Sequence, residues 1–376
     1  MSRVLFAGGG TGGHLYPALA LADAVRLERA DVSVHFAGAQ RGVEARVLPQ
    51  RGEPHTLLPL VPIFRDHPWR NWRLAPSLGR SFISLARLFA MFRPGLVVGT
   101  GGYASGPACL YAVTRGVPVA VQEQNSWPGL TTRMLARWAM QVHLGFPEAA
   151  SHLRPGRRTR VLTLGNPIRP PDPSLERIPS RGTFGLSSDA TILLVMGGSQ
   201  GARALNECLL GAIRLAKEGR VMSWPDGLEI LWATGPAHIE SISGRLASLG
   251  LGSRVRALGY IEDVPRALAA SDIAVSRAGA MATAELLAWG IPSLLVPLPT
   301  AAADHQLHNA RALEAAGAAL CLEEKTLTPE SLWSSIAELA RNDARRRSMA
   351  EAARSRARPD AARAIARELL TLVPSP

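Results

Sequence analysis

The sequence predicts an α/β protein with two Rossmann-like, doubly wound domains facing a cleft. Short apolar segments alternate with longer helix-like segments, which is the rhythm of parallel β-α-β units. The rhythm restarts at a strongly apolar segment, 191–196, and each half of the chain opens with a predicted strand followed by a glycine loop. A length of 376 residues suits two or three domains. Ligands of such sheets bind at the carboxyl ends of the strands, so a cleft between two of them suits a nucleotide-bearing substrate.

The predicted elements follow from short apolar runs and their flanking turn residues. In the first half, strands are predicted at 4–7, 32–37, 96–98, 117–122, 142–144 and 161–164, with a helix from about 16 to 29. In the second half, strands are predicted at 191–196, 229–233, 255–258, 273–276, 293–296 and 319–322. An Ala/Arg/Leu-rich, helical stretch covers about 328–371.

The domain boundaries are predicted from a proline-rich join. Five prolines between 165 and 190 are typical of a stiff, loop-like linker. We therefore expect an N-terminal domain at 1–166, a second domain at 167–355, and a C-terminal helix at 356–376 that packs back on the first domain.

Composition narrows the function classes. The chain has 42 basic and 30 acidic residues and a net charge of +12, and all its basic residues except Lys217 and Lys325 are arginine. Such a surface favours anions, including nucleotide phosphates and lipid headgroups. No nucleic-acid-binding motif is present, so no nucleic-acid partner is predicted. The three cysteines are far apart in the sequence, so we predict no disulfides. There is no Asp-x-Asp motif and no His/Cys cluster, so we predict no metal site and no cofactor.

Two uncharged stretches, 95–114 and 286–303, could be mistaken for membrane spans. Both contain several glycines or prolines, which would leave unsatisfied backbone groups in lipid. We predict that the chain spans no membrane but lies on one.

The first glycine loop reads Gly8-Gly9-Gly10-Thr11-Gly12-Gly13-His14. Glycines allow backbone amides to approach an anion, and the following helix N-terminus adds positive potential. The loop matches neither a P-loop nor a dinucleotide fingerprint. A neutral imidazole at His14 could take a proton from an acceptor hydroxyl. The alternative is a tight turn with a helix-capping histidine.

Two further polar segments end strands in the first half. The second loop, 99–107, contains Gly101, Gly102, Tyr103 and Ser105, and suggests either a second anion-binding loop or only a tight β-to-α connection. The segment 122–125 places four polar residues at the end of the next strand, which is costly unless they face a cleft. There Glu123 or Asn125 could bond sugar hydroxyls, unless the segment is ordinary polar loop.

The second half carries the most specific segment, 276–285. Small residues begin a helix after the strand 273–276, and their amides can hold a diphosphate without cationic residues or metal. Glu285 lies further along this helix, where a carboxylate can accept both ribose hydroxyls. Ser199, in the loop 197–202, is a predicted phosphate-binding hydroxyl, and residues 304–306 are predicted to contact the sugar.

With these motifs in this order, the chain resembles the family of inverting GT-B enzymes that transfer N-acetylglucosamine from UDP-GlcNAc to lipid I in bacterial peptidoglycan synthesis. The resemblance covers nearly the whole chain. The segments that carry it are 9–14, 101–107, 123–125, 165–169, 197–202 and 276–285. The chain departs from the family pattern at Thr132, where the family often has Asn, and at His305, where it often has Gln.

The resemblance implies specific roles. The donor, UDP-GlcNAc, would lie in the second domain and the lipid I acceptor against the first. Residues expected to bind the donor are Thr11, Gly12, Gly13, Asn125, Arg169, Ser199, Ile261, Ala280, Met281, Ala282, Thr283, Ala284, Glu285 and Gln306. His14 would deprotonate the muramyl C4 hydroxyl, with Glu123 as the rival base. Gly101, Gly102, Tyr103 and Ser105 would form an acceptor-side loop.

The expected location is the cytoplasmic face of the bacterial inner membrane, as a peripheral protein. The segment 60–73 mixes apolar, aromatic and basic residues, among them Phe64, Trp69 and Trp72, and an amphipathic helix is predicted at 80–93. Such a face suits an anionic membrane surface, although ordinary domain packing explains it nearly as well.

Three competing functions remain from the sequence. One is another GT-B glycosyltransferase with a lipid or natural-product acceptor. Another is a UDP-GlcNAc 2-epimerase, which needs no acceptor. The third is a non-catalytic module that binds nucleotide sugars or nucleic acid.

Overall fold

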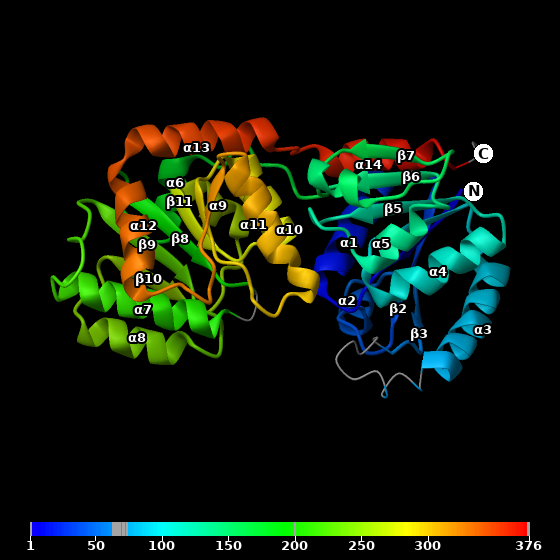
Figure 1. Ribbon diagram of the computed structural model, residues 1–376, viewed down its shortest axis with the longest axis horizontal. Coiled ribbons are helices and arrows are strands. Elements are labelled where there is room, and N and C mark those ends of the chain that lie inside the picture. Colours follow the sequence, from blue (N-terminus) through cyan, green and yellow to red (C-terminus); the bar gives the residue numbers. More distant parts are fainter. Residues whose placement is uncertain (1, 62–68, 70–71, 73, 199–200, 374–376) are drawn as a thin grey trace. The chain divides into compact units, whose positions relative to one another are not determined.

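The computed structural model describes residues 2–61, 69, 72, 74–198 and 201–373 of the chain (Figure 1). These residues form two compact units. The first unit contains 1–169 and 358–376, and the second contains 170–357. The C-terminal segment therefore belongs to the first unit, in which α14 (Ala361–Leu370) packs against α1 (Gly12–Glu28).

The first unit is built on a wholly parallel sheet, in which seven strands are described in the order β3-β2-β1-β4-β5-β6-β7. Its strands are β1 (Arg3–Ala7), β2 (Ser33–Ala39), β3 (His55–Leu58), β4 (Leu96–Gly99), β5 (Val119–Glu123), β6 (Gln141–Leu144) and β7 (Arg160–Thr163). Its other elements are α2 (Glu44–Gln50), α3 (Leu74–Phe92), α4 (Gly102–Thr114), α5 (Leu130–Leu135) and the 3₁₀ helix η2 (Pro147–His152), with α1 and α14. Apolar clusters lie on both faces of the sheet, as parallel sheets require.

The second unit repeats this plan with six described strands in the order β10-β9-β8-β11-β12-β13, again all parallel. Its strands are β8 (Thr191–Met196), β9 (Leu228–Ala233), β10 (Val255–Leu258), β11 (Ile273–Ser276), β12 (Ser293–Leu295) and β13 (Ala319–Cys321). Its helices are α6 (Arg177–Thr183), α7 (Arg203–Lys217), α8 (Ile239–Ser248), α9 (Val264–Ala270), α10 (Ala280–Trp289), η3 (Ala302–Asp304), α11 (His305–Ala315), α12 (Pro329–Arg341) and α13 (Asp343–Arg356).

The strand orders place the glycine loops in pairs. The order reverses between β1 and β4 in the first sheet and between β8 and β11 in the second, and each of these pairs is hydrogen-bonded. Ligands of doubly wound sheets bind at such switch points, outside the carboxyl ends of the strands. The loops after β1 and β4 therefore meet in the first unit, and those after β8 and β11 meet in the second.

The predicted α/β fold is confirmed, with three local corrections. The edge strand β3 was not predicted, because it has only four residues, most of them half-buried, and these give no clear apolar run. Helix α1 begins at Gly12 rather than Tyr16, so His14 lies inside its first turn. The amphipathic helix predicted at 80–93 is α3, which already begins at Leu74.

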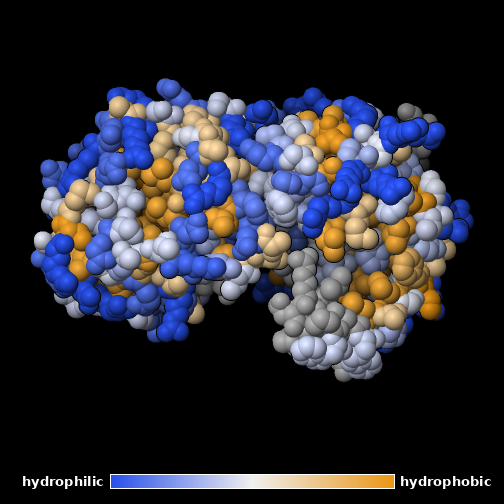
Figure 2. All heavy atoms as spheres, in the orientation of Figure 1, coloured by the Kyte–Doolittle hydropathy of each residue, from blue (hydrophilic) through white to orange (hydrophobic). Residues whose placement is uncertain are grey.

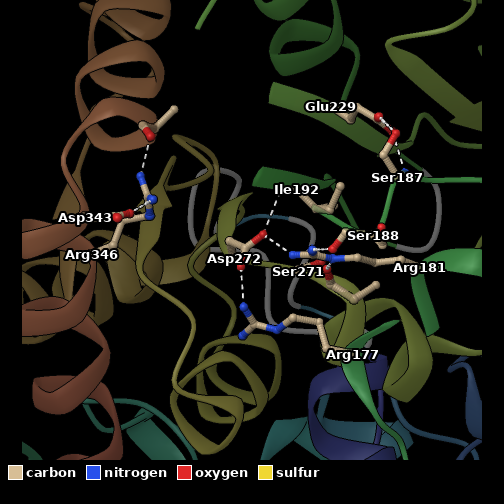
Figure 3. A network of polar contacts seen from close by, with 12 residues as sticks. Arg177, Arg181, Ser187, Ser188, Ile192, Glu229, Ser271, Asp272, Asp343 and Arg346 are labelled. Atoms are coloured by element: carbon tan, nitrogen blue, oxygen red, sulfur yellow. Dashed lines mark hydrogen bonds and ion pairs between the residues drawn. The ribbon is translucent and has the colours of Figure 1, made fainter. Parts of the chain in front are cut away.

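The join between the units was predicted to be a loop, but it contains the helix α6 (Figure 3). Pro179 is tolerated because it stands in the first turn of this helix. The buried Arg181 and the exposed Arg177 both bond the Asp272 carboxylate at 2.6 Å, and Asp272 also accepts the Ile192 amide at 2.7 Å. These contacts tie α6 to the beginnings of β8 and β11.

Candidate active site

The second unit contains a cavity of about 680 Å³ at its switch point. Sequence-predicted residues that line it include Ile261, Ala282, Glu285 and Gln306. Residues 197, 198, 201 and 202 of the glycine loop also line it, whereas Ser199 lies outside the described residues. The cavity thus gathers segments that are more than a hundred positions apart in the sequence.

The glycine loop after β8 needs glycine for two reasons. Gly198 and Gly201 have positive φ angles of 97° and 74°, which side chains other than glycine rarely adopt. A Cβ on Gly201 would also lie 2.2 Å from the Thr234 carbonyl oxygen. The loop therefore passes close to the strand end of β9 before α7 begins.

Helix α10 directs its N-terminus to this switch point. It follows β11 after three residues, and its N-cap, Gly279, offers no side chain to the first-turn amides. Such an N-terminus favours a phosphate group. Of residues 280–285, Ala282 and Glu285 line the cavity. Thr283 is buried and donates its hydroxyl to the Gly279 and Ala280 carbonyls, each at 3.1 Å, so its side chain serves the helix.

Glu285 is the titratable group of this cavity whose ionisation is most perturbed. Burial raises the pKa of its carboxyl group from 4.5 to about 7, because the charged form loses hydration. A carboxylate that is costly to bury gains most when two hydroxyl groups donate to it. Its environment therefore suits a ligand that offers a pair of hydroxyls.

Gln306 and Ile261 complete the predicted set. The Gln306 side-chain oxygen accepts the Leu298 amide at 3.0 Å, which fixes the orientation of this side chain in the cavity wall. Ile261 is buried beside the half-exposed Tyr260, which also lines the cavity. An aromatic ring and a backbone edge at this position suit a planar base.

The sequence reasoning missed a charged pair in the cavity wall. Arg277 is 11% exposed and pairs with Glu324 at 2.5 Å, and both residues line the cavity. From the sequence, backbone amides alone were expected to hold a diphosphate, whereas this wall also presents a cationic side chain. Arg277 could have been predicted as a site residue, since it directly follows the strand end at Ser276. Its partner could not, because Glu324 is 47 positions away in the sequence.

In the first unit, the loop after β1 presents Thr11 and His14. Thr11 is the N-cap of α1 but makes no capping hydrogen bond; instead its hydroxyl lies 3.1 Å from His14 Nδ1. The Thr100 hydroxyl donates to the His14 carbonyl at 2.8 Å. The imidazole is packed so closely on the second glycine loop that a Cβ on Gly101 would lie 2.6 Å from its Cδ2 atom. Gly12 and Gly13 occupy the first positions of α1.

The two glycine loops of the first unit touch each other. A Cβ on Gly102, whose φ is 76°, would lie 2.0 Å from the Gly9 carbonyl oxygen. Ser105 is buried and donates to the Gly102 carbonyl at 3.0 Å, so its hydroxyl supports the loop. Tyr103 packs against Gly10, and burial and the nearby Glu44 charge raise the pKa of its phenol.

Glu44 is the second residue that sequence reasoning missed. It is fully buried at the start of α2, and both its carboxylate oxygens accept the Gly10 amide, at 3.0 and 2.9 Å. One of them also accepts the Ala39 amide at 2.7 Å. The Gly10 amide is therefore not available to an external anion, whereas the residues of this loop that were expected to bind the donor are Thr11, Gly12 and Gly13.

Glu123 has three hydrogen bonds within its own loop. Its carboxylate accepts the amides of Asn125 and Gly129, both at 3.0 Å, and the Asn125 side chain at 3.3 Å. It is 3% exposed. These bonds hold the segment that leads into α5. Because the carboxylate already has this structural role, His14 is favoured as the base.

The predicted donor residue Arg169 is exposed. It is the last residue of the first unit before the chain enters the second unit.

Replacement of Glu123 should separate these roles. In Glu123→Gln one of the two amide contacts would face an NH₂ group, so we expect the loop to loosen and kcat to fall about tenfold. The pH dependence of kcat/KM should keep the shape of the wild type, because the base is still present. Loss of the acidic limb of that profile in Glu123→Gln would instead identify Glu123 as the base.

Comparison with known proteins agrees with the fold. Residues 4–144 match the glycosyltransferase family 28 N-terminal domain, and residues 192–365 match the C-terminal domain of the same family. A relative from Salinibacter ruber, named UDP-N-acetylglucosamine--N-acetylmuramyl-(pentapeptide) pyrophosphoryl-undecaprenol N-acetylglucosamine transferase, is 42% identical over 98% of this chain and 96% of its own. A relative of the same name from Chlorobaculum parvum is 41% identical, over 98% and 99% of the two chains.

A solved structure, that of Acinetobacter baumannii MurG, superposes with a TM-score of 0.78 at 29% identity, covering 99% of this chain and 100% of that chain. The family match and the fold together define a UDP-sugar-dependent glycosyltransferase of the GT-B class. The chain belongs to glycosyltransferase family 28. The resemblance inferred from the sequence motifs is thereby confirmed.

Proposed function

We propose that the chain transfers N-acetylglucosamine from UDP-GlcNAc to the muramyl C4 hydroxyl of lipid I, with inversion, to give lipid II. The observation that carries the proposal is the cavity of the second unit, in which Glu285, the N-terminus of α10 and a glycine loop surround one space. Its volume lies within the range of sites for nucleotide-sized ligands. The names of the family 28 relatives supply the acceptor.

The cavity residues suggest one orientation of the donor. The uracil would lie by Ile261, the ribose hydroxyls would donate to Glu285, and the diphosphate would meet the N-terminus of α10 and the loop 197–202. Gln306 would bond the sugar. Arg277, held by Glu324, would add positive potential near the phosphates. Of the other predicted donor residues, Ala280, Met281, Thr283 and Ala284 would act through the backbone of α10.

The reaction needs a proton acceptor on the acceptor side. The His14 imidazole would take the proton of the C4 hydroxyl while the C4 oxygen attacks C1 of GlcNAc. The bond from C1 to the β-phosphate oxygen breaks, and UDP leaves with the electron pair. In-line attack on the α-linked donor gives a β-linked product. The remaining predicted residues, Thr11 to Gly13, Asn125 and Arg169, would border the transferred sugar.

No helix in the part of the chain that the structure describes is long and apolar enough to cross a bilayer.

The proposed acceptor is a membrane lipid, so we also propose that the first unit docks on an anionic membrane surface, at the cytoplasmic face. Figure 2 shows apolar side chains gathered over α3 and α4. Exposed apolar residues there include Ile83, Met91 and Leu110, and Trp69 and Trp72, which precede α3, are also exposed. Arg80, Arg87 and Arg93 lie exposed on or beside α3, where they can meet lipid phosphates. Phe64 lies outside the described residues.

The decisive experiment measures transfer of radiolabelled GlcNAc from UDP-GlcNAc to a short-chain lipid I analogue. We expect a β-linked product and, because helix and loop amides and Arg277 offset the phosphate charge, activity that persists in EDTA. Folded, UDP-binding protein that transfers nothing to this acceptor would reject the lipid I proposal. Parallel incubations with other lipid acceptors and with no acceptor would then detect another glycosyltransferase or a 2-epimerase.

A further inference from the structure

The first glycine loop has its own anion, the carboxylate of Glu44. A glycine loop that leads into a helix is expected to offer its amides to a ligand phosphate. Here the Gly10 amide is bonded to both oxygens of Glu44, and the carboxylate reaches back to the Ala39 amide at the end of β2. The carboxylate therefore joins the ends of β1 and β2.

Three glycines make room for this carboxylate. A Cβ on Gly9 would lie 2.1 Å from one carboxylate oxygen, and a Cβ on Gly42 would lie 2.2 Å from the other. A Cβ on Gly38 would lie 2.4 Å from the Glu44 side chain. The glycine density of this region is thus explained by the fit around Glu44 as well as by the turn itself.

The charge of Glu44 is costly where it lies. The side chain has no exposed surface, and its donors are the backbone amides of Gly10 and Ala39. A buried carboxylate is retained only where its hydrogen bonds are good. Here they fix Gly10 at a φ of 89°, one residue before Thr11, the N-cap of the helix that carries His14.

We propose that Glu44 is a positioning residue for transfer: its carboxylate occupies the anion position of the first glycine loop and fixes the segment from which Thr11 and His14 project. The inference rests on the proposed function, since it gives this loop the task of placing the base. The diphosphates of donor and acceptor must then be held without the Gly10 amide. Tyr103 also packs against Gly10.

The test compares three substitutions in the full-length protein. Glu44→Gln keeps one oxygen but turns an NH₂ group toward the Gly10 amide, and Glu44→Ala leaves both amides without their acceptor. Gly42→Ala keeps Glu44 but displaces its carboxylate. The matched control is Glu53→Gln in the same unit, because Glu53 is also nearly buried, bonds Arg26 at 2.6 Å and precedes β3, at the amino ends of the strands.

Transfer kinetics give the first measurement. We expect kcat to fall about tenfold in Glu44→Gln and Gly42→Ala and about 10²-fold in Glu44→Ala, while the KM for UDP-GlcNAc stays within about twofold. Added formate should restore part of the kcat of Glu44→Ala by replacing the carboxylate. Glu53→Gln should lower the melting temperature, because it weakens the pair with Arg26, but should leave kcat unchanged. Wild-type kcat in folded Glu44→Gln and Gly42→Ala would overturn the inference.

Amide hydrogen exchange gives a measurement that does not depend on activity. Exchange at Gly10 and Ala39 should be faster in the Glu44 variants and unchanged in Glu53→Gln. Unchanged protection of these amides in Glu44→Ala would overturn the inference whatever the activity. If the wild type transfers no GlcNAc while Glu44→Ala loses this protection, the proposed reaction is rejected and the loop-holding role of Glu44 stands.

Discussion

Replacement of His14 by alanine should lower kcat for transfer to a lipid I analogue by about 10²- to 10⁴-fold, the usual contribution of a positioned general base. UDP binding should be unchanged, because the cavity assigned to the donor is lined entirely by residues of the second unit. The imidazole is the group expected to take the C4 proton. Its ring is held by the Thr11 hydroxyl and by the surface of the second glycine loop.

The pH profile distinguishes chemistry from folding. Wild-type kcat/KM should fall toward acidic pH as an essential imidazole is protonated, and His14→Ala should lose this limb. Added imidazole should restore part of the rate of His14→Ala. The control is His55→Ala, since His55 is at the start of β3 and bonds the Glu53 carbonyl, away from the loops. A His14→Ala protein with near-wild-type kcat would remove His14 from the chemistry.

The sequence predicted the repeated β-α-β plan because the strands are short apolar runs with regular spacing. It predicted that the segments 197–202 and 276–285 border one site because each follows a strand, and the strand order brings both segments to one cavity. It missed β3, because a half-buried edge strand of four residues has little apolar pattern. The boundary of α1 was misplaced because its first residues, Gly12 and Gly13, are poor helix formers.

The missed site residues share a different cause. Glu44 and Glu324 act through partners 34 and 47 positions away, so their roles depend on tertiary contacts that a single sequence does not show. Glu44 begins a short helix and reads as an ordinary surface acid. Its burial depends on the absence of side chains at Gly9, Gly38 and Gly42, and only the fold brings these glycines together. These two acids were thus harder to predict than the glycine loops, or than Glu285, which follows a recognisable motif.

Replacement of Glu285 by alanine should weaken UDP binding by about 10²-fold, because two hydrogen bonds from ribose hydroxyls to a charged, half-buried acceptor are lost. The wild-type affinity should also depend on pH. With a pKa of about 7 in the empty cavity, Glu285 is mostly protonated at pH 6 and mostly ionised at pH 8. The ionised form accepts both hydroxyls, so binding should strengthen about tenfold over this range.

The raised pKa of Glu285 also affects the stability of the empty protein. It stabilises the fold at low pH, and this contribution is lost as pH rises through about 7.

Calorimetric titration with UDP at pH 6 and pH 8 checks this prediction, with Glu285→Gln as the reference. The UDP phosphate titrates in the same range, but it does so equally for both proteins, so the difference between them isolates Glu285. Glu207→Ala is the control, because Glu207 forms an exposed pair with Arg245 and should bind UDP as the wild type does. An equal pH dependence in wild type and Glu285→Gln would show that Glu285 does not titrate against the ligand. Full UDP affinity in Glu285→Ala would show that the ribose does not bind Glu285 of α10, and would reject the proposed orientation of the donor.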